Sequence, residues 1–273
     1  QEVIRYRVDT EEKKGYLRVI SNIKSLVEYI ENKISYKFNK FGIGTPGTID
    51  PKTALLKNSN SQCLNGKPIQ KDLSETLDKT ILIQNDANCF ALAETLLGSV
   101  KDQYPNAKNV FGIIMGTGVG GGVIINGKTV YGSHGIGGEW GHTVVTDSGD
   151  KCYCGKRGCV ETVISGRALQ TYYSNISGRK LKFEEIYALK DSDKYAKETF
   201  NRLIIHFGKG LSNVVNILDP EVIVLGGGLS NIDELYSEGY EELKKYVFNP
   251  TFNTPIIRPK LGDSAGVYGA ALL

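Results

Sequence analysis

Three cysteines and one histidine lie close together in the middle of the chain. Cys152, Cys154 and Cys159 follow His142 in the stretch that runs from GEWGH to CYCGKRGC. The chain has only 5 cysteines and 3 histidines, so we treat the grouping as a metal site rather than as a coincidence. A Cys₃His set suits tetrahedral zinc, and four protein ligands leave no coordination position open for catalysis. We therefore predict a structural zinc ion.

Two carboxylates flank this cluster. Glu139 precedes the histidine, and Glu161 follows the last cysteine. A lone surface glutamate carries no functional meaning, but a structural metal would hold both of these side chains in place. Paired rigid carboxylates are suited to accepting hydrogen bonds from the hydroxyls of a polyhydroxylated ligand.

The 32 glycines form three clusters, at 42–47, 116–122 and 226–228, and each follows a β-rich apolar stretch. A strand that ends in a glycine turn is how α/β proteins bring backbone N–H groups up to phosphates. Thr117 adds a hydroxyl donor to the second cluster. The alternative is a glycine-rich hairpin that serves only tight packing.

Asp86 follows a predicted strand and opens a predicted helix. The ordinary interpretation is a helix N-cap. The functional interpretation is a base that accepts a proton from a substrate hydroxyl, since a helix N-terminus favours the ionised carboxylate. Phosphoryl transfer needs little beyond positioning, charge neutralisation and an oriented hydroxyl.

Composition limits the possible classes of function. The chain has 273 residues, of which 40% are hydrophobic and 23% are charged, and its net charge is +3. This charge gives no argument for a nucleic-acid or membrane partner. No apolar run approaches the roughly 20 residues that cross a bilayer, and no signal-peptide pattern opens the chain. Three cysteines that bind a metal rather than form disulfides favour a location in the reducing cytoplasm.

Periodicity predicts an α/β fold in which strands alternate with helices. The segment 50–68 lacks periodicity, and we interpret it as a functional loop. The predicted strands are 2–8, 41–44, 81–83, 110–115, 119–125 and 222–225, and the predicted helices are 17–34, 86–98, 196–218 and 264–273.

Together these residues resemble a known family. GTPG, NDAN, GTGVGGG, GEWGH, CYCGKRGCVET and VIVLGGG occur in the order typical of the ROK family (repressor, open reading frame, kinase). The resemblance covers nearly the whole chain. KNSNSQCLNGKPIQKDL and CYCGKRGCVETVISG most resemble the bacterial fructokinase/mannokinase branch, and N-acetylglucosamine kinases are similar through NDANCFAL.

The resemblance implies an actin-like (ribonuclease H-like) two-domain sugar kinase fold with a central cleft. Residues 1–106 and 263–273 would form the small domain, and 107–262 the large domain with the zinc site. Asp86 matches the catalytic base. The matching sugar-binding positions are Gly47, Asn60, Asn85, Asp86, Glu139, His142 and Glu161. The matching nucleotide-binding positions are Gly116, Thr117, Gly118, Gly120, Gly226, Gly227 and Gly228. The predicted zinc ligands are His142, Cys152, Cys154 and Cys159.

The expected reaction is ATP-dependent phosphorylation of a hexose at its 6-hydroxyl, with Mg²⁺ on the phosphates and fructose as the first choice of sugar. N-acetylglucosamine kinase and glucokinase activities are the alternatives within the family. A non-catalytic sugar-binding regulator and a sugar-responsive repressor are the alternatives from other classes. We expect a homodimer.

One motif of the family's kinases is not found in this sequence. Those kinases begin with a strand and an Asp-x-Gly-Gly-Thr-Lys phosphate loop, and residues 2–8 look like the strand that follows it. We expect a missing N-terminal segment of about twenty residues, because a sheet without its first strand exposes an open edge.

Overall fold

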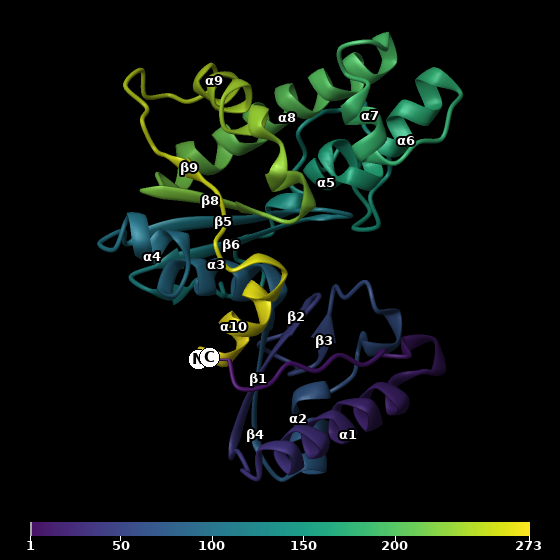
Figure 1. Ribbon diagram of the computed structural model, residues 1–273, viewed down its shortest axis with the longest axis vertical. Helices are drawn as coiled ribbons and strands as arrows, with labels where there is room; N and C mark the ends of the chain where they lie inside the picture. The colour runs from purple at the N-terminus through teal and green to yellow at the C-terminus, as the bar shows by residue number, and fades with distance from the viewer. Residues whose placement is uncertain (1) are drawn as a thin grey trace.

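The computed structural model describes residues 2–273. A five-stranded sheet in the order β7-β6-β5-β8-β9 crosses the middle of the molecule (Figure 1). In this sheet β6 runs antiparallel to β5, whereas β8 runs parallel to it. Below it, β1 pairs with β4 in parallel, and β2 pairs with β3 antiparallel. The predicted α/β class is therefore confirmed.

Strands and α-helices follow one another along the whole described chain. The strands are β1 Lys40–Thr45, β2 Thr48–Ile49, β3 Leu56–Lys57, β4 Thr80–Asn85, β5 Asn109–Met115, β6 Val119–Ile125, β7 Lys128–Thr129, β8 Val222–Gly226 and β9 Ile256–Ile257. The α-helices are α1 Tyr16–Ile34, α2 Ile69–Leu77, α3 Asp86–Leu96, α4 Ser99–Gln103, α5 Val160–Ile164, α6 Gly166–Ser177, α7 Phe183–Ala188, α8 Lys194–Leu218, α9 Glu238–Lys244 and α10 Ala265–Ala271.

The predicted strand at 2–8 is wrong. A β-strand needs a neighbouring strand for its backbone hydrogen bonds, and the described part of the chain supplies none beside this segment. The segment instead lies across the surface, where the Tyr6 ring packs against the Tyr29 ring of α1 with the centroids 4.4 Å apart, and Val3 is 77% exposed. The ends of the other predicted strands and helices lie within two residues of their observed bounds.

The longest helix, α8, has clear start and stop signals. The Asp193 side chain accepts hydrogen bonds from the Tyr195 and Ala196 N–H groups, and Asp219 ends the helix in the left-handed conformation before Pro220. One face of α8 is buried on the five-stranded sheet. Within residues 2–273, no helix is both long enough and apolar enough to cross a membrane.

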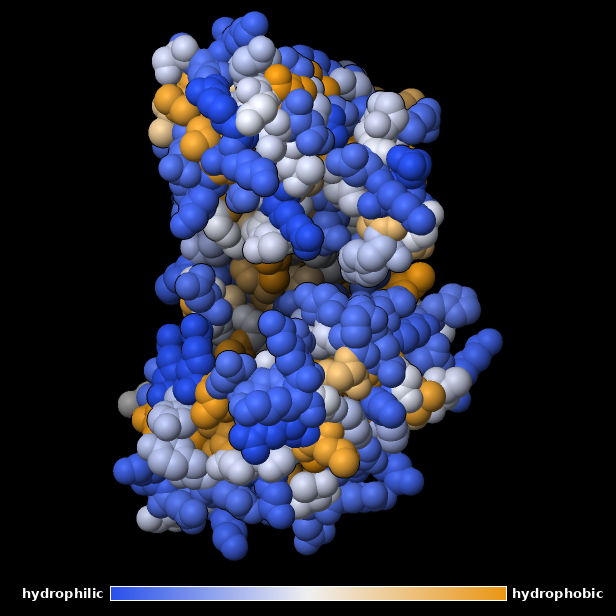
Figure 2. Space-filling model, turned by 90° about the vertical axis from the view of Figure 1, so that its right-hand side faces the viewer, coloured by the Kyte–Doolittle hydropathy of each residue, from blue (hydrophilic) through white to orange (hydrophobic). Residues whose placement is uncertain are grey.

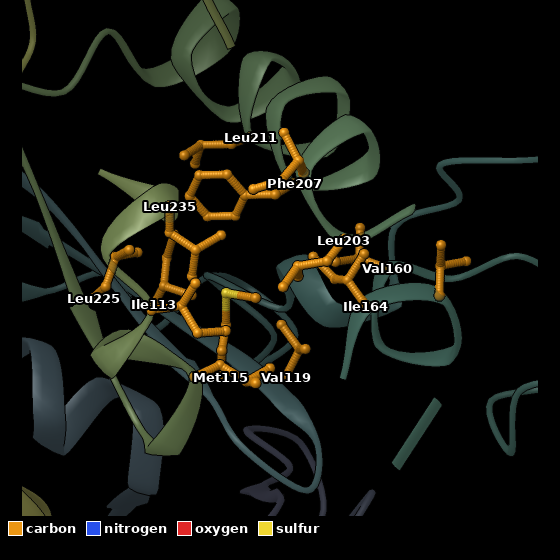
Figure 3. Packing of buried hydrophobic residues seen from close by; sticks show 14 of the residues in the cluster. Ile113, Met115, Val119, Val160, Ile164, Leu203, Phe207, Leu211, Leu225 and Leu235 are labelled. Atoms are coloured by element: carbon orange, nitrogen blue, oxygen red, sulfur yellow. The ribbon is translucent and has the colours of Figure 1, made fainter. Parts of the chain in front are cut away.

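The main core lies between this face of α8 and the sheet. Figure 3 shows Ile113 and Met115 of β5 pointing toward Phe207 and Leu211 of α8. All four side chains are almost fully buried. This packing holds β5, the strand from which the glycine loop continues.

The opposite face of the sheet is covered by α3, beside α10 (Figure 1). The contacts are too close for larger side chains. A Cβ at Gly112 of β5 would lie 2.5 Å from the Ala91 Cβ of α3, and one at Gly42 of β1 would lie 1.7 Å from the Ala270 carbonyl oxygen. Because α3 contacts both groups of strands and α10 packs on α3 and on β1, these helices connect the two parts of the molecule. The division into 1–106 with 263–273 and 107–262 remains a prediction.

Candidate active site

The four predicted zinc ligands surround one point in space. Their ligand atoms all lie within 4.8 Å of one another. The Cys152 Sγ lies 3.4 Å from the His142 Nδ1, and the Cys154 and Cys159 Sγ atoms are 3.6 Å apart. Zn–S bonds of about 2.3 Å in a tetrahedron place two sulfur atoms about 3.8 Å apart. The donor set and its spacing therefore fit a structural zinc ion.

Trp140 fixes the turn that carries Glu139 and His142. Its side chain is buried, and its Nε1 donates to the Gly210 carbonyl of α8 at 3.0 Å. The His142 Nδ1 faces the cysteines, whereas its Nε2 lies 2.8 Å from the Tyr153 hydroxyl. A contact on the second ring nitrogen holds the imidazole in one orientation.

Asp86 stands at the junction of β4 and α3, but it is not the helix cap. Asn85 is the cap residue, and its Oδ1 accepts the Ala87 N–H at 2.9 Å. The Asp86 Oδ1 accepts the same N–H at 2.9 Å. The Asp86 residue is exposed to solvent, but desolvation by the surrounding protein raises the pKa of its carboxyl group, and the hydrogen bond from the Ala87 N–H opposes this shift. The N-cap position of α3 is thus occupied by Asn85, and Asp86 shares with it only the hydrogen bond from Ala87.

All seven predicted sugar-binding residues line one cavity of about 220 Å³, which we call the Asp86 cavity. Figure 2 shows a recess between the upper and lower parts of the molecule on the face that it presents. Gly47 is held in the turn after β1 with φ of 83°, and its carbonyl accepts the Asn85 Nδ2 at 3.2 Å. The predicted loop 50–68 contributes Asn58 and Asn60 to the wall.

The carboxylates in this cavity have different partners. The Glu161 Oε2 accepts the Val119 N–H at 3.0 Å. Burial raises the pKa of Glu139, the charge of His142 lowers it, and the charges of Asp86 and Glu161 raise it further. Clustered acidic groups together with asparagine amides provide both acceptors and donors for a ligand with several hydroxyls.

The glycine loop after β5 separates the Asp86 cavity from a second cavity of about 660 Å³. Gly116 and Thr117 line both cavities, whereas Gly118 and Gly120 line the Asp86 cavity. The other residues that line the second cavity are Gly166, Arg167, Gln170, Phe183, Glu184, Tyr187, Gly228, Leu229, Asn231 and Ile232.

The three glycines at 226–228 have different surroundings. Gly228 lines the second cavity. A Cβ at Gly226 would lie 2.5 Å from the Phe90 ring, and one at Gly227, where φ is 79°, would lie 2.3 Å from the Met115 carbonyl oxygen. Gly226 and Gly227 therefore permit close packing at the end of β8, while Gly228 faces the cavity.

Sequence reasoning missed several residues that line these cavities. Tyr153 lines the Asp86 cavity, and its place inside the CYCG motif was the available signal. Arg167 and Gln170 of α6 line the second cavity together with Phe183 and Tyr187 of α7. No local motif marked these four residues, because α6 and α7 come to the glycine loop only through the fold.

The ROK family model matches residues 3–273. The chain belongs to the ROK family. It is 39% identical to the N-acetyl-D-glucosamine kinase of Mannheimia succiniciproducens, over 98% of this chain and 90% of that protein. It is 38% identical to the enzyme of the same name from Histophilus somni, with the same coverage. These relatives do not support the expected closeness to the fructokinase branch.

Solved structures agree with the family assignment. A ROK hexokinase from Thermus thermophilus superposes with a TM-score of 0.83 and 31% identity, over 95% of this chain and 86% of that chain. A ROK glucokinase from Streptomyces griseus, in complex with glucose and AMPPNP, gives a TM-score of 0.76 and 26% identity, with coverage of 94% and 87%. The predicted actin-like fold is confirmed.

Proposed function

We propose that this chain is an ATP-dependent kinase that phosphorylates the 6-hydroxyl of a hexose or an N-acetylhexosamine. One observation carries the proposal. The Asp86 carboxylate, which follows the cap residue Asn85, shares a cavity with the glycine loop and with Glu139, His142 and Glu161. A base, a set of hydroxyl acceptors and a phosphate-binding turn are the parts that phosphoryl transfer to a sugar requires.

In the proposed reaction, Asp86 accepts the proton of the sugar hydroxyl. The hydroxyl oxygen forms a bond to the γ-phosphorus of ATP, the bond from that phosphorus to the β-γ bridging oxygen breaks, and ADP leaves. Glu139, His142 and Glu161 orient the sugar, while Gly116 and the residues after it hold the phosphates in the direction of the second cavity. Mg²⁺ bound with ATP would neutralise phosphate charge.

The pKa of Asp86 predicts the pH dependence of this reaction. Desolvation by the surrounding protein raises this pKa above its ordinary value of about 3.9. Because the base must be ionised, kcat/KM should fall as the pH decreases through the raised pKa. The measurement is kcat/KM across the acid range, with pH-stable coupling enzymes. An acid limb at or below the ordinary aspartate pKa would contradict the role of Asp86 as base.

N-acetylglucosamine is the first substrate that we propose. The named relatives are N-acetyl-D-glucosamine kinases, and other kinases of that name are 34–36% identical to this chain. Fructose, the first choice from the sequence motifs, is the second candidate. It rests on the similarity of CYCGKRGCVETVISG to the fructokinase branch.

A coupled assay of ADP release with a sugar panel tests the activity and ranks the substrates. N-acetylglucosamine, fructose, mannose and glucose are compared at matched enzyme concentration. We expect turnover, with the highest kcat/KM for N-acetylglucosamine. A site built around a polar group rejects analogues that lack the group by up to about 10⁴-fold. Best turnover of fructose would restore the fructokinase assignment, and sugar binding without turnover would favour a regulator.

Assembly and location are further proposals. A homodimer is supported by a groove that Ile125, Ile136 and Ile217 line beside the Asp86 cavity, where Ile217 is 88% exposed. A cytoplasmic location is supported by the three thiols that zinc would require in reduced form.

A further inference from the structure

One short segment holds the glycine loop at both of its ends. The segment begins at the zinc ligand Cys159 and runs through α5 to the start of α6. At one end, the Glu161 Oε2 accepts the Val119 N–H at 3.0 Å. At the other end, the Gly166 N–H donates to the Gly116 carbonyl at 2.8 Å. The position of the loop is therefore set by residues that follow the metal cluster.

The contact with Glu161 depends on a glycine. A Cβ at position 118 would lie 2.6 Å from the Glu161 Oε2, which is closer than real Cβ atoms approach. Gly118 has no room for a side chain while the carboxylate reaches the backbone of Val119. The absence of a side chain at Gly118 therefore leaves room for the Glu161 carboxylate as well as for a bound phosphate.

Glu161 also retains capacity for a ligand. An ionised carboxylate has about four acceptor positions. Within residues 2–273, the Val119 N–H is the one group that donates a hydrogen bond to this side chain. Glu161 also lines the Asp86 cavity. One oxygen can therefore accept a sugar hydroxyl while the other keeps the loop in place. Glu139 lines the same cavity and makes no such contact with the loop.

We propose that Glu161 couples the two substrates, so that a bound sugar raises the affinity for ATP. This inference rests on the proposed function. A sugar hydroxyl on one oxygen restricts the carboxylate, and the restricted carboxylate restricts the loop through Val119. ATP then binds a loop that the sugar has already ordered, so less conformational entropy is lost when ATP binds. Coupling is reciprocal, so ATP must raise the affinity for the sugar by the same factor, typically 5- to 150-fold.

The test measures the Kd of a non-hydrolysable ATP analogue by calorimetry, with and without saturating sugar. The ratio of the two values is the coupling factor. We expect a factor of at least about 5 for the unmodified protein. Glu161→Ala should reduce it to near 1. Glu139→Gln is the matched control, because it should weaken sugar binding and leave the coupling factor unchanged.

A second variant keeps the carboxylate and disturbs its contact with the loop through a Cβ at position 118. Gly118→Ala should reduce the coupling factor more than it reduces sugar affinity. Its control is Gly266→Ala, where an added Cβ would meet nothing within 4 Å. Zinc content and thermal melting establish that each variant is folded.

The outcomes separate this inference from the proposed function. A coupling factor near 1 in the unmodified protein, or an undiminished factor in both Glu161→Ala and Gly118→Ala, overturns the role of Glu161 even if the protein phosphorylates sugars. Failure of the unmodified protein to bind or phosphorylate any sugar overturns the proposed function itself.

Discussion

Replacing Asp86 with asparagine should lower kcat by at least ~100-fold, which is the scale expected for loss of a general base. The amide keeps the size of the side chain but cannot accept the proton of the sugar hydroxyl. The KM for the sugar should change by only a few-fold, because Glu139, His142 and Glu161 remain in the cavity. Steady-state kinetics with the best sugar of the panel provides the measurement.

A control and a stability measurement accompany this variant. Asp191→Asn changes an aspartate that is 88% exposed and should leave kcat unchanged. Because folding raises the pKa of Asp86, the fold favours its protonated form, and any stability from this group is lost as the pH rises through the folded pKa. Asp86→Asn should therefore melt at the same temperature as the unmodified protein, or higher, at neutral pH. Near-normal turnover in this variant would remove Asp86 from the chemistry.

Removal of zinc is expected to have the second large effect. Purified protein should contain close to one zinc equivalent per chain. Cys154→Ser should lose the metal and lower the melting temperature by about 10 °C or more, because a structural metal contributes directly to folding free energy. Activity should fall as well, since Glu139, His142 and Glu161 all lie next to the cluster in the chain. Metal analysis and thermal melting measure both effects.

Cys63→Ser is the matched control, because Cys63 lies outside the metal cluster. It should keep the zinc and the activity. A stable and active Cys154→Ser protein without metal would show that the cluster does not hold a structural ion.

Much of the site could be predicted because the residues that carry its chemistry lie in short, recognisable stretches of the sequence. His142 and the three cysteines lie in one short stretch, and their types alone define the ligand set. Asp86 was found by its place between a strand and a helix. Sequence alone left its capping role open, because choosing between Asn85 and Asp86 as the cap requires the backbone geometry.

The remainder depends on contacts between distant segments. Residues 2–8 have the alternation of a strand, but alternation does not supply a partner, and pairing decides whether a strand forms. The walls of the second cavity come from α6, α7 and the turn after β8. α6 packs on α5 and α8, and α7 packs on α6 and α8, so their place beside the glycine loop depends on contacts between helices that no local motif reveals.

The position of α10 has a consequence for synthesis of the chain. Gly269 and Ala270 pack against Cys89 of α3 and Gly42 of β1, which lie far upstream in the chain and are synthesised much earlier. At ordinary rates of translation, roughly 10 to 40 seconds separate the two events. During that interval the surfaces of β1 and α3 that α10 later covers remain exposed. Nascent chains of this protein should therefore depend on chaperones until α10 has been synthesised.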